Sequence, residues 1–321
     1  MSSVARSAPP GERGHGEGGV GGIGGVVAEI AADVKVAHSV FALPFALLSA
    51  VLAVATIPGT GVWSATVALV LVVVVMVSAR TAAMLANRLL DRRIDARNPR
   101  TRDRAIPAGR LSVGAALTAL LVCTAAYFAA CAGFGVLVHN WWPLRLALPV
   151  LAWLLAYGLL KRFTMLCHFW LGASLAMSPP AAALAVGPEA LAHAAPWLLA
   201  ASVLTWVAGF DIIYALQDQA VDQQEGLHSI PARLGTTRAL AVSRWLHAGS
   251  AAALGAVWWL EPRLHGMVFG GAVALVALLL VVEHATVRRW GTTRMALTFF
   301  TINGCVSLLV GGAGIVSVIL G

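Results

Sequence analysis

Long apolar stretches alternate with short polar connections along most of the chain. The apolar segments cover residues 36–57, 62–90, 113–138, 143–160, 163–187, 196–219, 238–260, 265–284 and 297–320. A helix needs about 20 apolar residues to cross a bilayer, and Pro and Gly occur at several of the joins. The pattern predicts an all-α fold, a polytopic membrane bundle of about nine transmembrane helices.

Composition supports this prediction. Only 11% of the residues are charged, 59% are hydrophobic and the mean hydropathy is +0.83. A soluble domain carries about a quarter charged residues, so too few charges are present to cover a water-facing surface. The net charge of +8 comes from Lys and Arg in the polar connections, which indicates orientation and contact with anionic membrane lipids. We expect no nucleic-acid partner.

The first residues differ from the rest. Residues 1–32 are rich in Gly, Ser and Pro and contain no apolar core of a signal peptide. This composition predicts a disordered Gly-rich cytoplasmic tail, followed by one transmembrane domain over residues 33–321.

Basic residues concentrate in every second connection between apolar segments. These residues are Arg88, Arg92, Arg93, Arg97, Arg100, Arg102, Arg104, Arg110, Lys161, Arg162, Arg233, Arg238, Arg244, Arg288, Arg289 and Arg294. Cytoplasmic loops are enriched in Lys and Arg. We therefore expect a multi-pass protein of the plasma membrane with these loops and the N-terminus in the cytoplasm.

The second and sixth apolar segments both end in acidic residues. Asn87, Asp91 and Asp95 are four residues apart, as are Asp218 and Asp222, so each set shares one helix face. Neighbouring carboxylates repel each other, whereas Mg²⁺ takes one or two carboxylates together with waters and substrate phosphates. The spacing predicts two acidic helix ends that hold Mg²⁺ and, through it, a diphosphate.

A weak internal repeat strengthens this interpretation. Residues 105–112, AIPAGRLS, follow the first acidic end, and residues 229–235, SIPARLG, follow the second. Asp211 lies two turns before Asp218 on the same face. One acidic pair at a helix end is typical of a solvated surface, but two copies on the same membrane side favour one shared cavity.

Several basic and aromatic side chains are expected at the same membrane level. Arg80 lies deeper on the face of Asn87; an Arg inside a span costs about 2.5 kcal/mol or more and indicates a functional site, or a pair with Asp91 or Asp211. Lys161 and Arg162 end the fourth segment and either bind anionic oxygens or mark topology.

Four further side chains give weaker signals. Arg104 belongs to a basic loop that would close over a diphosphate. Tyr157 and Tyr214 lie near the expected cavity, where an aromatic face would stabilise a cation or simply pack. His168 has no partner at metal-ligand spacing and is interpreted as structural.

The motifs resemble those of a known family. Residues 87–95, NRLLDRRID, with the segment 104–112, are similar to the first signature of the UbiA superfamily of intramembrane aromatic prenyltransferases. Residues 211–222, DIIYALQDQAVD, with the segment 226–235, are similar to the second. Residues 157–164, YGLLKRFT, resemble the 4-hydroxybenzoate polyprenyltransferase-like branch.

Two details bear on the choice within that family. The first signature often carries an Asp where this chain has Arg88, so one acidic ligand is absent. The segments 80–88 and 209–214 look closer to a sub-branch that serves the futalosine route to menaquinone. The aromatic acceptor therefore stays open.

The resemblance implies a nine-helix UbiA-type prenyltransferase fold around a lipid-open cavity. It implies Mg²⁺-dependent transfer of a polyprenyl group from polyprenyl diphosphate to an aromatic hydroxy-carboxylic acid, of the 4-hydroxybenzoate or dihydroxynaphthoate type, in respiratory quinone biosynthesis. The implied metal ligands are Asn87, Asp91, Asp95, Asp218 and Asp222. The implied catalytic residues are Asp91, Asp95, Asp218, Asp222 and Lys161. The implied substrate-binding residues are Arg80, Asn87, Arg104, Tyr157, Arg162, Asp211 and Tyr214.

Two alternatives stay open at this point. A haem, chlorin or other aromatic acceptor would leave the diphosphate site unchanged. A membrane transporter would explain a repeat and an intramembrane Arg, but transporter sites usually lie near the membrane midplane at broken helices. Neither acidic segment carries a Gly or Pro interruption in mid-span.

Overall fold

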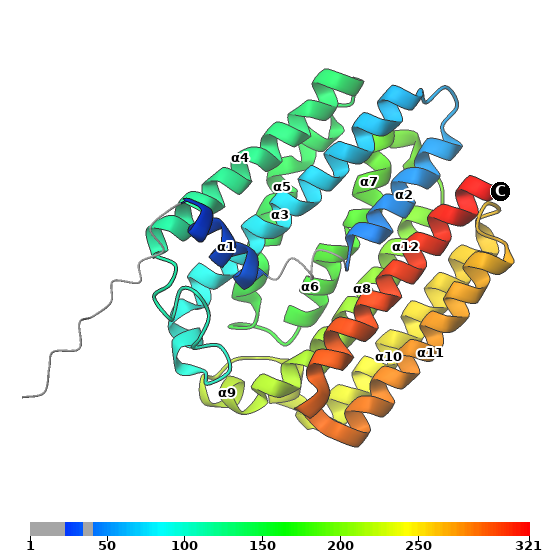
Figure 1. The fold of residues 1–321 in the computed structure, drawn as a ribbon. Coiled ribbons are helices and arrows are strands. Elements are labelled where there is room, and N and C mark those ends of the chain that lie inside the picture. The colour runs from blue at the N-terminus through cyan, green and yellow to red at the C-terminus, as the bar shows by residue number, and fades with distance from the viewer. Residues whose placement is uncertain (1–22, 35–40) are drawn as a thin grey trace, which may run out of the picture.

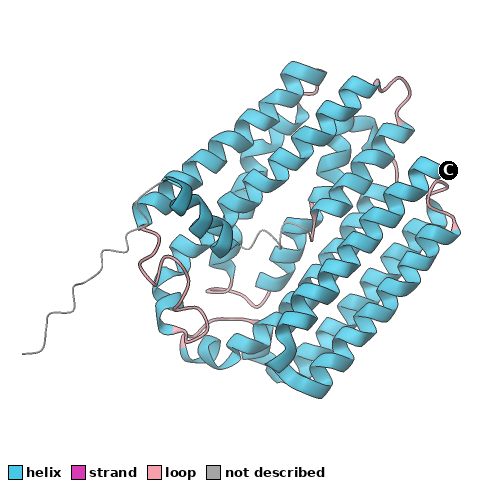
Figure 2. Ribbon diagram, viewed as in Figure 1, coloured by secondary structure: helices cyan, strands magenta, loops and turns pink. Residues whose placement is uncertain are grey.

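The computed structural model of the chain describes residues 23–34 and 41–321, and every regular element in these ranges is helical (Figure 2). The α-helices are α1 (Ile23–Val34), α2 (Leu43–Thr56), α3 (Val62–Arg97), α4 (Val113–Val138), α5 (Trp142–Leu160), α6 (Cys167–Ala176), α7 (Ser178–Val186), α8 (Ala195–Ala215), α9 (Gln219–Gln224), α10 (Ile230–Leu260), α11 (Met267–Trp290) and α12 (Asn303–Leu320). Short 3-10 helices cover Pro188–Ala192, Leu216–Asp218 and Gly291–Arg294, and a π-helix covers Ala296–Ile302.

Seven helical segments of the described chain are long and apolar enough to cross a membrane, and α2 is a shorter apolar helix. The all-α membrane bundle predicted from the apolar pattern is confirmed. Within the fifth predicted span, α6 ends at Ala176 and α7 begins at Ser178. Pro179 and Pro180 suit the first turn of a helix but would break its interior, which explains the division.

Helix α3 extends well beyond the predicted boundary at residue 90. Its 36 residues make a rod of about 54 Å at 1.5 Å per residue, whereas the hydrocarbon core of a bilayer is about 30 Å thick. The helix therefore continues into the polar region. Asp91 and Asp95 lie on this extension, with their common face turned toward the protein, because both are buried.

The helices pack into one closed bundle. From α2 to α8 and from α10 to α12, helices that follow one another in the chain pack side by side. Helix α10 also packs against α8, and α12 packs back against α2. Figure 1 shows α3, α4 and α5 grouped on one side and α8, α10, α11 and α12 on the other, with α2, α6 and α7 between them. The main core fills the second group and includes Phe45, Leu199, Trp206, Phe210 and Phe269.

The connections separate cleanly between the two ends of the bundle. The loop over residues 98–112 and helix α9 lie at one end, and the C-terminus lies at the opposite end (Figure 1). Both acidic helix ends therefore lie on the same side of the bundle. This agrees with the prediction, because the second and sixth predicted spans cross the membrane in the same direction.

The predicted N-terminal tail ends earlier in the structure than at residue 32. Residues 1–22 lie outside the described residues, but α1 is helical from Ile23. Val26 and Ile30 pack against a small cluster that contains Leu89 and Ile106. An apolar face that finds a partner on α3 and its following loop explains why this part of the Gly-rich segment folds.

Candidate active site

Asp91 is held by the end of α5. Lys161 Nζ lies 2.7 Å from Asp91 Oδ2, and Arg162 Nη2 lies 2.9 Å from Asp91 Oδ1. Arg162 also donates to the carbonyl of Leu90 at 3.1 Å. Asp91 is only 2% exposed, so its charge requires compensation. In this structure Lys161 and Arg162 thus pair with a carboxylate of the chain itself, and their binding of substrate oxygens stays a prediction.

Asp95, one turn further along α3, is held by the loop that follows. Arg104 Nη1 donates to both oxygens of Asp95 at 2.7 Å. The Thr101 hydroxyl donates to the backbone carbonyl of Asp95 at 3.1 Å. The basic loop therefore folds back over the first acidic segment, and its closure over a diphosphate stays a prediction.

Asp218 is contacted from the other half of the chain. Arg100 Nε and Nη2 donate to its two oxygens at 2.8 and 2.5 Å, and Asn98 Nδ2 donates to Oδ1 at 3.0 Å. Arg100 Nη1 also donates to the Tyr214 hydroxyl at 3.1 Å. Burial lowers the pKa of Arg100, but the hydrogen bond and charge of Asp218 raise it more, so the net pKa is raised and the guanidinium stays charged.

Asp222 is held by the connection between α9 and α10. The Ser229 hydroxyl donates to Asp222 Oδ2 at 2.6 Å, and the Leu227 N–H donates to the Asp222 carbonyl at 2.7 Å. The same connection reaches α5, because the His228 N–H donates to the carbonyl of Lys161 at 2.7 Å. This loop therefore contacts the second acidic segment and the end of α5, whose Lys161 pairs with Asp91.

Two cations lie between the acidic helix ends. Lys161 pairs with Asp91 and also interacts electrostatically with Asp222. Arg100 pairs with Asp218 and interacts electrostatically with Asp95. The predicted meeting of the two acidic segments is thus present in the fold. We call the four carboxylates, with Lys161, Arg162, Arg104 and Arg100, the acidic mouth.

Arg80 and Tyr157 lie deeper than the acidic mouth. Tyr157 interacts electrostatically with Arg80, Arg88, Asp91 and Asp211. Arg80 Nε is buried and makes no hydrogen bond within the described part of the chain. The alternative in which Arg80 pairs with Asp91 or Asp211 is not what the structure shows, since both carboxylates have other partners.

Asn87 packs tightly against α5. A side-chain carbon added to Gly158 would lie 2.6 Å from Asn87 Oδ1, so a larger residue there would force this amide to move. The contact fixes α3 against α5 one turn before Asp91. A direct role for Asn87 toward a metal stays a prediction.

Asp211 and His168 form a pair that the spacing did not predict. His168 Nδ1 lies 2.6 Å from Asp211 Oδ2, and the Ile230 N–H donates to His168 Nε2 at 3.1 Å. The structure also adds Asn98, Arg100 and Ser229 to the residues expected at the site. The partner of Asn98 and Arg100 lies more than 100 residues away in the sequence, so no local spacing could have indicated these two contacts.

The oxygen donors of the acidic mouth fit Mg²⁺ by their chemistry. Mg²⁺ prefers oxygen ligands and needs only one or two carboxylates when substrate phosphates complete its shell. Across residues 23–34 and 41–321, no group of three or more His, Cys, Asp and Glu side chains is placed to hold a metal ion. Each carboxylate instead faces a cation or a hydroxyl group. Mg²⁺ would replace these groups as the partner of the carboxylates, and a diphosphate would become the partner of the released cations.

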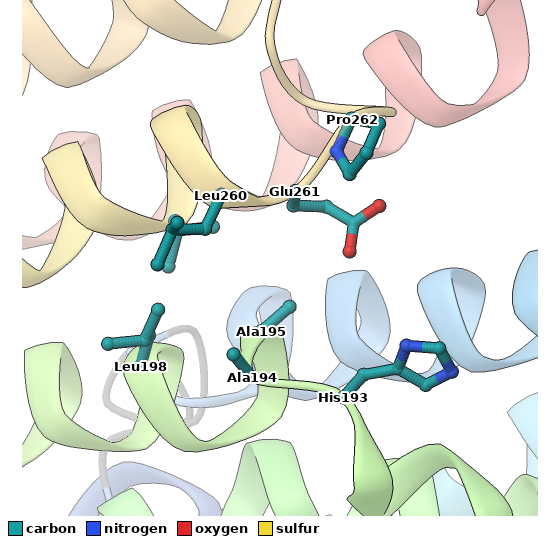
Figure 3. A pocket seen from close by; sticks show the side chains of 8 residues that line it. His193, Ala194, Ala195, Leu198, Leu260, Glu261 and Pro262 are labelled. Atoms are coloured by element: carbon teal, nitrogen blue, oxygen red, sulfur yellow. The ribbon is translucent and has the colours of Figure 1, made fainter.

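A small cavity elsewhere does not belong to this site. It has a volume of about 120 Å³ and lies between the start of α8 and the end of α10, lined by His193, Leu198, Glu261 and Pro262 among others (Figure 3). The acidic mouth lies at the opposite ends of these helices.

Comparison with known proteins agrees with the motifs and the fold. The UbiA prenyltransferase family model matches residues 41–305, most of the chain. The chain belongs to this family. The fold is also similar to the apo structure of a UbiA homolog from Aeropyrum pernix, with a TM-score of 0.75, 33% identity and coverage of 87% of this chain and 97% of that chain.

Curated relatives match over part of their length. The chain is 34% identical over 160 residues to a 4-hydroxybenzoate octaprenyltransferase of Nitrosomonas europaea, which covers 49% of this chain and 51% of that protein. It is 32% identical over 156 residues to the enzyme of the same name in Pseudoalteromonas atlantica, covering 49% and 52%. The chain thus spans about half the length of these relatives.

A more distant structure shows the fold alone. A UbiA homolog from Archaeoglobus fulgidus, bound to GPP and Mg²⁺, has a TM-score of 0.66 at 17% identity and covers 91% of this chain and 99% of that chain. The fold, the family and an integral membrane protein are therefore established.

Proposed function

We propose that this family member transfers a polyprenyl group from a polyprenyl diphosphate to an aromatic hydroxy-carboxylic acid in respiratory quinone biosynthesis. The observation that carries the proposal is the acidic mouth, in which four carboxylates from two distant helix ends converge with Lys161 and Arg100 between them. The curated relatives named for 4-hydroxybenzoate octaprenyl transfer support this substrate class.

The acidic and basic residues of the acidic mouth would have separate roles. Asp91, Asp95, Asp218 and Asp222 would hold Mg²⁺, and Mg²⁺, when bound, would supply positive charge that stabilises the leaving diphosphate. Lys161, Arg104 and Arg162 would bind the phosphate oxygens once these replace the carboxylates as partners. Charge stabilisation of this kind is usually the largest catalytic contribution.

The deeper residues would form the acceptor side of the site. Arg80 offers a buried guanidinium with an unsatisfied Nε for the acceptor's carboxylate, and Tyr157 interacts electrostatically with both Arg80 and Asp211. Loss of diphosphate leaves an allylic carbocation on the prenyl group. Attack by the electron-rich ring and loss of a ring proton then complete the transfer. Tyr214, which touches Arg100, would lie beside the diphosphate.

We also propose that the acidic mouth faces the cytoplasm, in the plasma membrane. The basic connections at this end of the bundle support the orientation under the positive-inside rule. The diphosphate group and the aromatic acceptor would then reach the site from the cytoplasm, while the prenyl chain would lie in the lipid.

Purified full-length protein with Mg²⁺ and geranyl diphosphate tests the function. Reactions contain either 4-hydroxybenzoate or a dihydroxynaphthoate, and mass spectrometry follows the prenylated product. We expect product with one acceptor class and its loss on addition of EDTA. A protein that yields no product with any aromatic acceptor, including haem and chlorin precursors, but moves a diphosphate across liposome membranes would instead be a transporter.

A further inference from the structure

His168 is a buried histidine that the function proposed above does not use. It lies near the start of α6 and is 3% exposed. The Ile230 N–H is a donor and reaches Nε2, so Nε2 carries no proton and the neutral ring carries it on Nδ1. Nδ1–H then donates to Asp211 Oδ2 at 2.6 Å. The imidazole therefore connects α6, α8 and the start of α10.

The contact with Ile230 anchors the start of α10. Ile230 is the first residue of that helix, and the first N–H groups of a helix have no partner within it. Ser229, the N-cap, accepts from the Ala232 N–H at 3.4 Å and donates its own hydroxyl proton to Asp222 Oδ2. Through the adjacent residues Ser229 and Ile230, the position of His168 is linked to that of Asp222.

The other contact places Asp211 at the acceptor side of the site. Asp211 lies seven residues before Asp218 on α8, about 10 Å deeper at 1.5 Å per residue. Its side chain is 23% exposed while that of His168 is 3% exposed, so the carboxylate is accessible and the imidazole lies behind it. Asp211 also interacts with Tyr157, which in turn interacts with Arg80.

We propose that His168 is a positioning residue of the prenyl-transfer site. It fixes one oxygen of Asp211, which leaves Oδ1 to accept a hydrogen bond from the acceptor's hydroxyl group. It also ties that carboxylate to the loop that holds Asp222, so the acceptor side and the diphosphate side keep a constant separation. The inference rests on the function proposed above, and His168 itself touches neither substrate.

Replacement of His168 tests the inference in the full-length protein. His168→Phe keeps the ring volume but loses both hydrogen bonds. His168→Gln keeps one donor and one acceptor. Since a misplacement of about 1 Å at a reacting centre costs up to about 100-fold in rate, we expect kcat of His168→Phe to fall about 10- to 100-fold. KM for the prenyl diphosphate should change by less than about twofold, and His168→Gln should recover much of the lost rate.

A double-mutant cycle shows whether His168 acts through Asp211. In an Asp211→Asn background, His168→Phe should have little further effect on kcat, because residues that act as one unit are not additive. Independent, multiplicative losses in the two single variants would overturn the proposal. So would a His168→Gln variant as slow as His168→Phe.

A matched control separates positioning from general stability. His247 is also 3% exposed and hydrogen-bonded, but it lies on α10 among α8 and α11. His247→Phe should lower the melting temperature about as much as His168→Phe while the rate per folded molecule stays near that of wild type. Equal kinetic effects of the two variants would show a purely structural role for His168. If wild-type protein itself forms no product, the proposed function fails, whereas an active wild type with an unaffected His168→Phe variant refutes only the positioning role.

Discussion

Two polar clusters in this bundle are built in different ways. The acidic mouth balances its carboxylates with Lys and Arg side chains, and several of these groups are partly exposed. The second cluster, which we call the buried polar network, consists of Trp206, His247, Glu283 and Asn303 on α8, α10, α11 and α12. Each of its members is at most 3% exposed.

Hydrogen bonds connect three of the four members of the buried polar network. Trp206 Nε1 donates to Asn303 Oδ1 at 2.6 Å, and Asn303 Nδ2 donates to Glu283 Oε1 at 2.9 Å. Glu283 Oε2 lies 3.7 Å from His247 Nδ1, beyond hydrogen-bond distance. The hydrogen bonds thus join α8, α11 and α12, and His247 of α10 lies beside them, at positions that solvent does not reach.

The difference shows how location decides what polar groups do in a membrane bundle. Ion pairs at an accessible mouth exchange partners at little cost, since an incoming diphosphate or metal replaces one charge by another. Groups in the buried polar network have no incoming partner, and breaking one bond leaves a buried polar atom unsatisfied. We therefore expect the first cluster to control activity and the second to control stability.

The largest expected effect is on the acidic mouth. Asp218→Asn removes the charge that Arg100 binds and a proposed oxygen ligand of Mg²⁺, so the initial rate of prenyl transfer should fall about 100- to 1000-fold. Thermal melting should change little. Asp103→Asn, an exposed acid in the α3–α4 loop, is the control and should retain the wild-type rate. A rate for Asp218→Asn close to that of Asp103→Asn would contradict the assignment.

A smaller effect, on stability rather than on activity, is expected in the buried polar network. Glu283→Ala removes the acceptor of Asn303 Nδ2, and the free energy of unfolding should fall by about 1–3 kcal/mol. Glu283→Gln keeps an acceptor and should lose less. Melting in detergent measures the stability, and the rate per folded molecule at low temperature should stay within about twofold of wild type. Lost activity at unchanged stability would place this network in the reaction instead.

The smallest effect is expected at the rim of the mouth. Arg97 Nη2 lies 2.7 Å from Glu225 Oε2, but the Arg97 side chain is 61% exposed. Exposed pairs of this kind contribute at most about 1 kcal/mol. Glu225→Gln should therefore leave the rate unchanged and lower the melting temperature only slightly, and less still in high salt. A large loss of activity would extend the functional cluster to this pair.

Part of the site could be predicted from residue spacing within single segments of the sequence. The four-residue steps from Asn87 to Asp95 follow the helical period of α3, so their shared face did not depend on the rest of the fold. Asp218, in contrast, ends a 3-10 helix and Asp222 lies in the separate helix α9, so the second step does not lie on one α-helix. Lys161 and Arg104 were expected near anionic groups from their place at span ends and in a basic loop. The structure brings both to carboxylates of α3.

Other contacts could not be predicted in this way. Arg100 and Asp218 are 118 residues apart, and His168 and Asp211 are 43 apart. Arg100 appeared only as one of many basic loop residues, and His168 as a structural histidine. Whether such residues meet depends on which helix faces pack together, and the sequence near each residue does not contain that information.

The sequence by itself determined the membrane bundle, the two acidic helix ends and the family signatures. Each of these is written in the length of an apolar segment or in the period of one helix, and both are local properties. Only the tertiary structure decided that Lys161 and Arg100 lie between the acidic ends, and that one imidazole links Asp211 to the start of α10. Those arrangements arise from packing between helices, where a shift of one turn moves a side chain about 5.4 Å and replaces every partner.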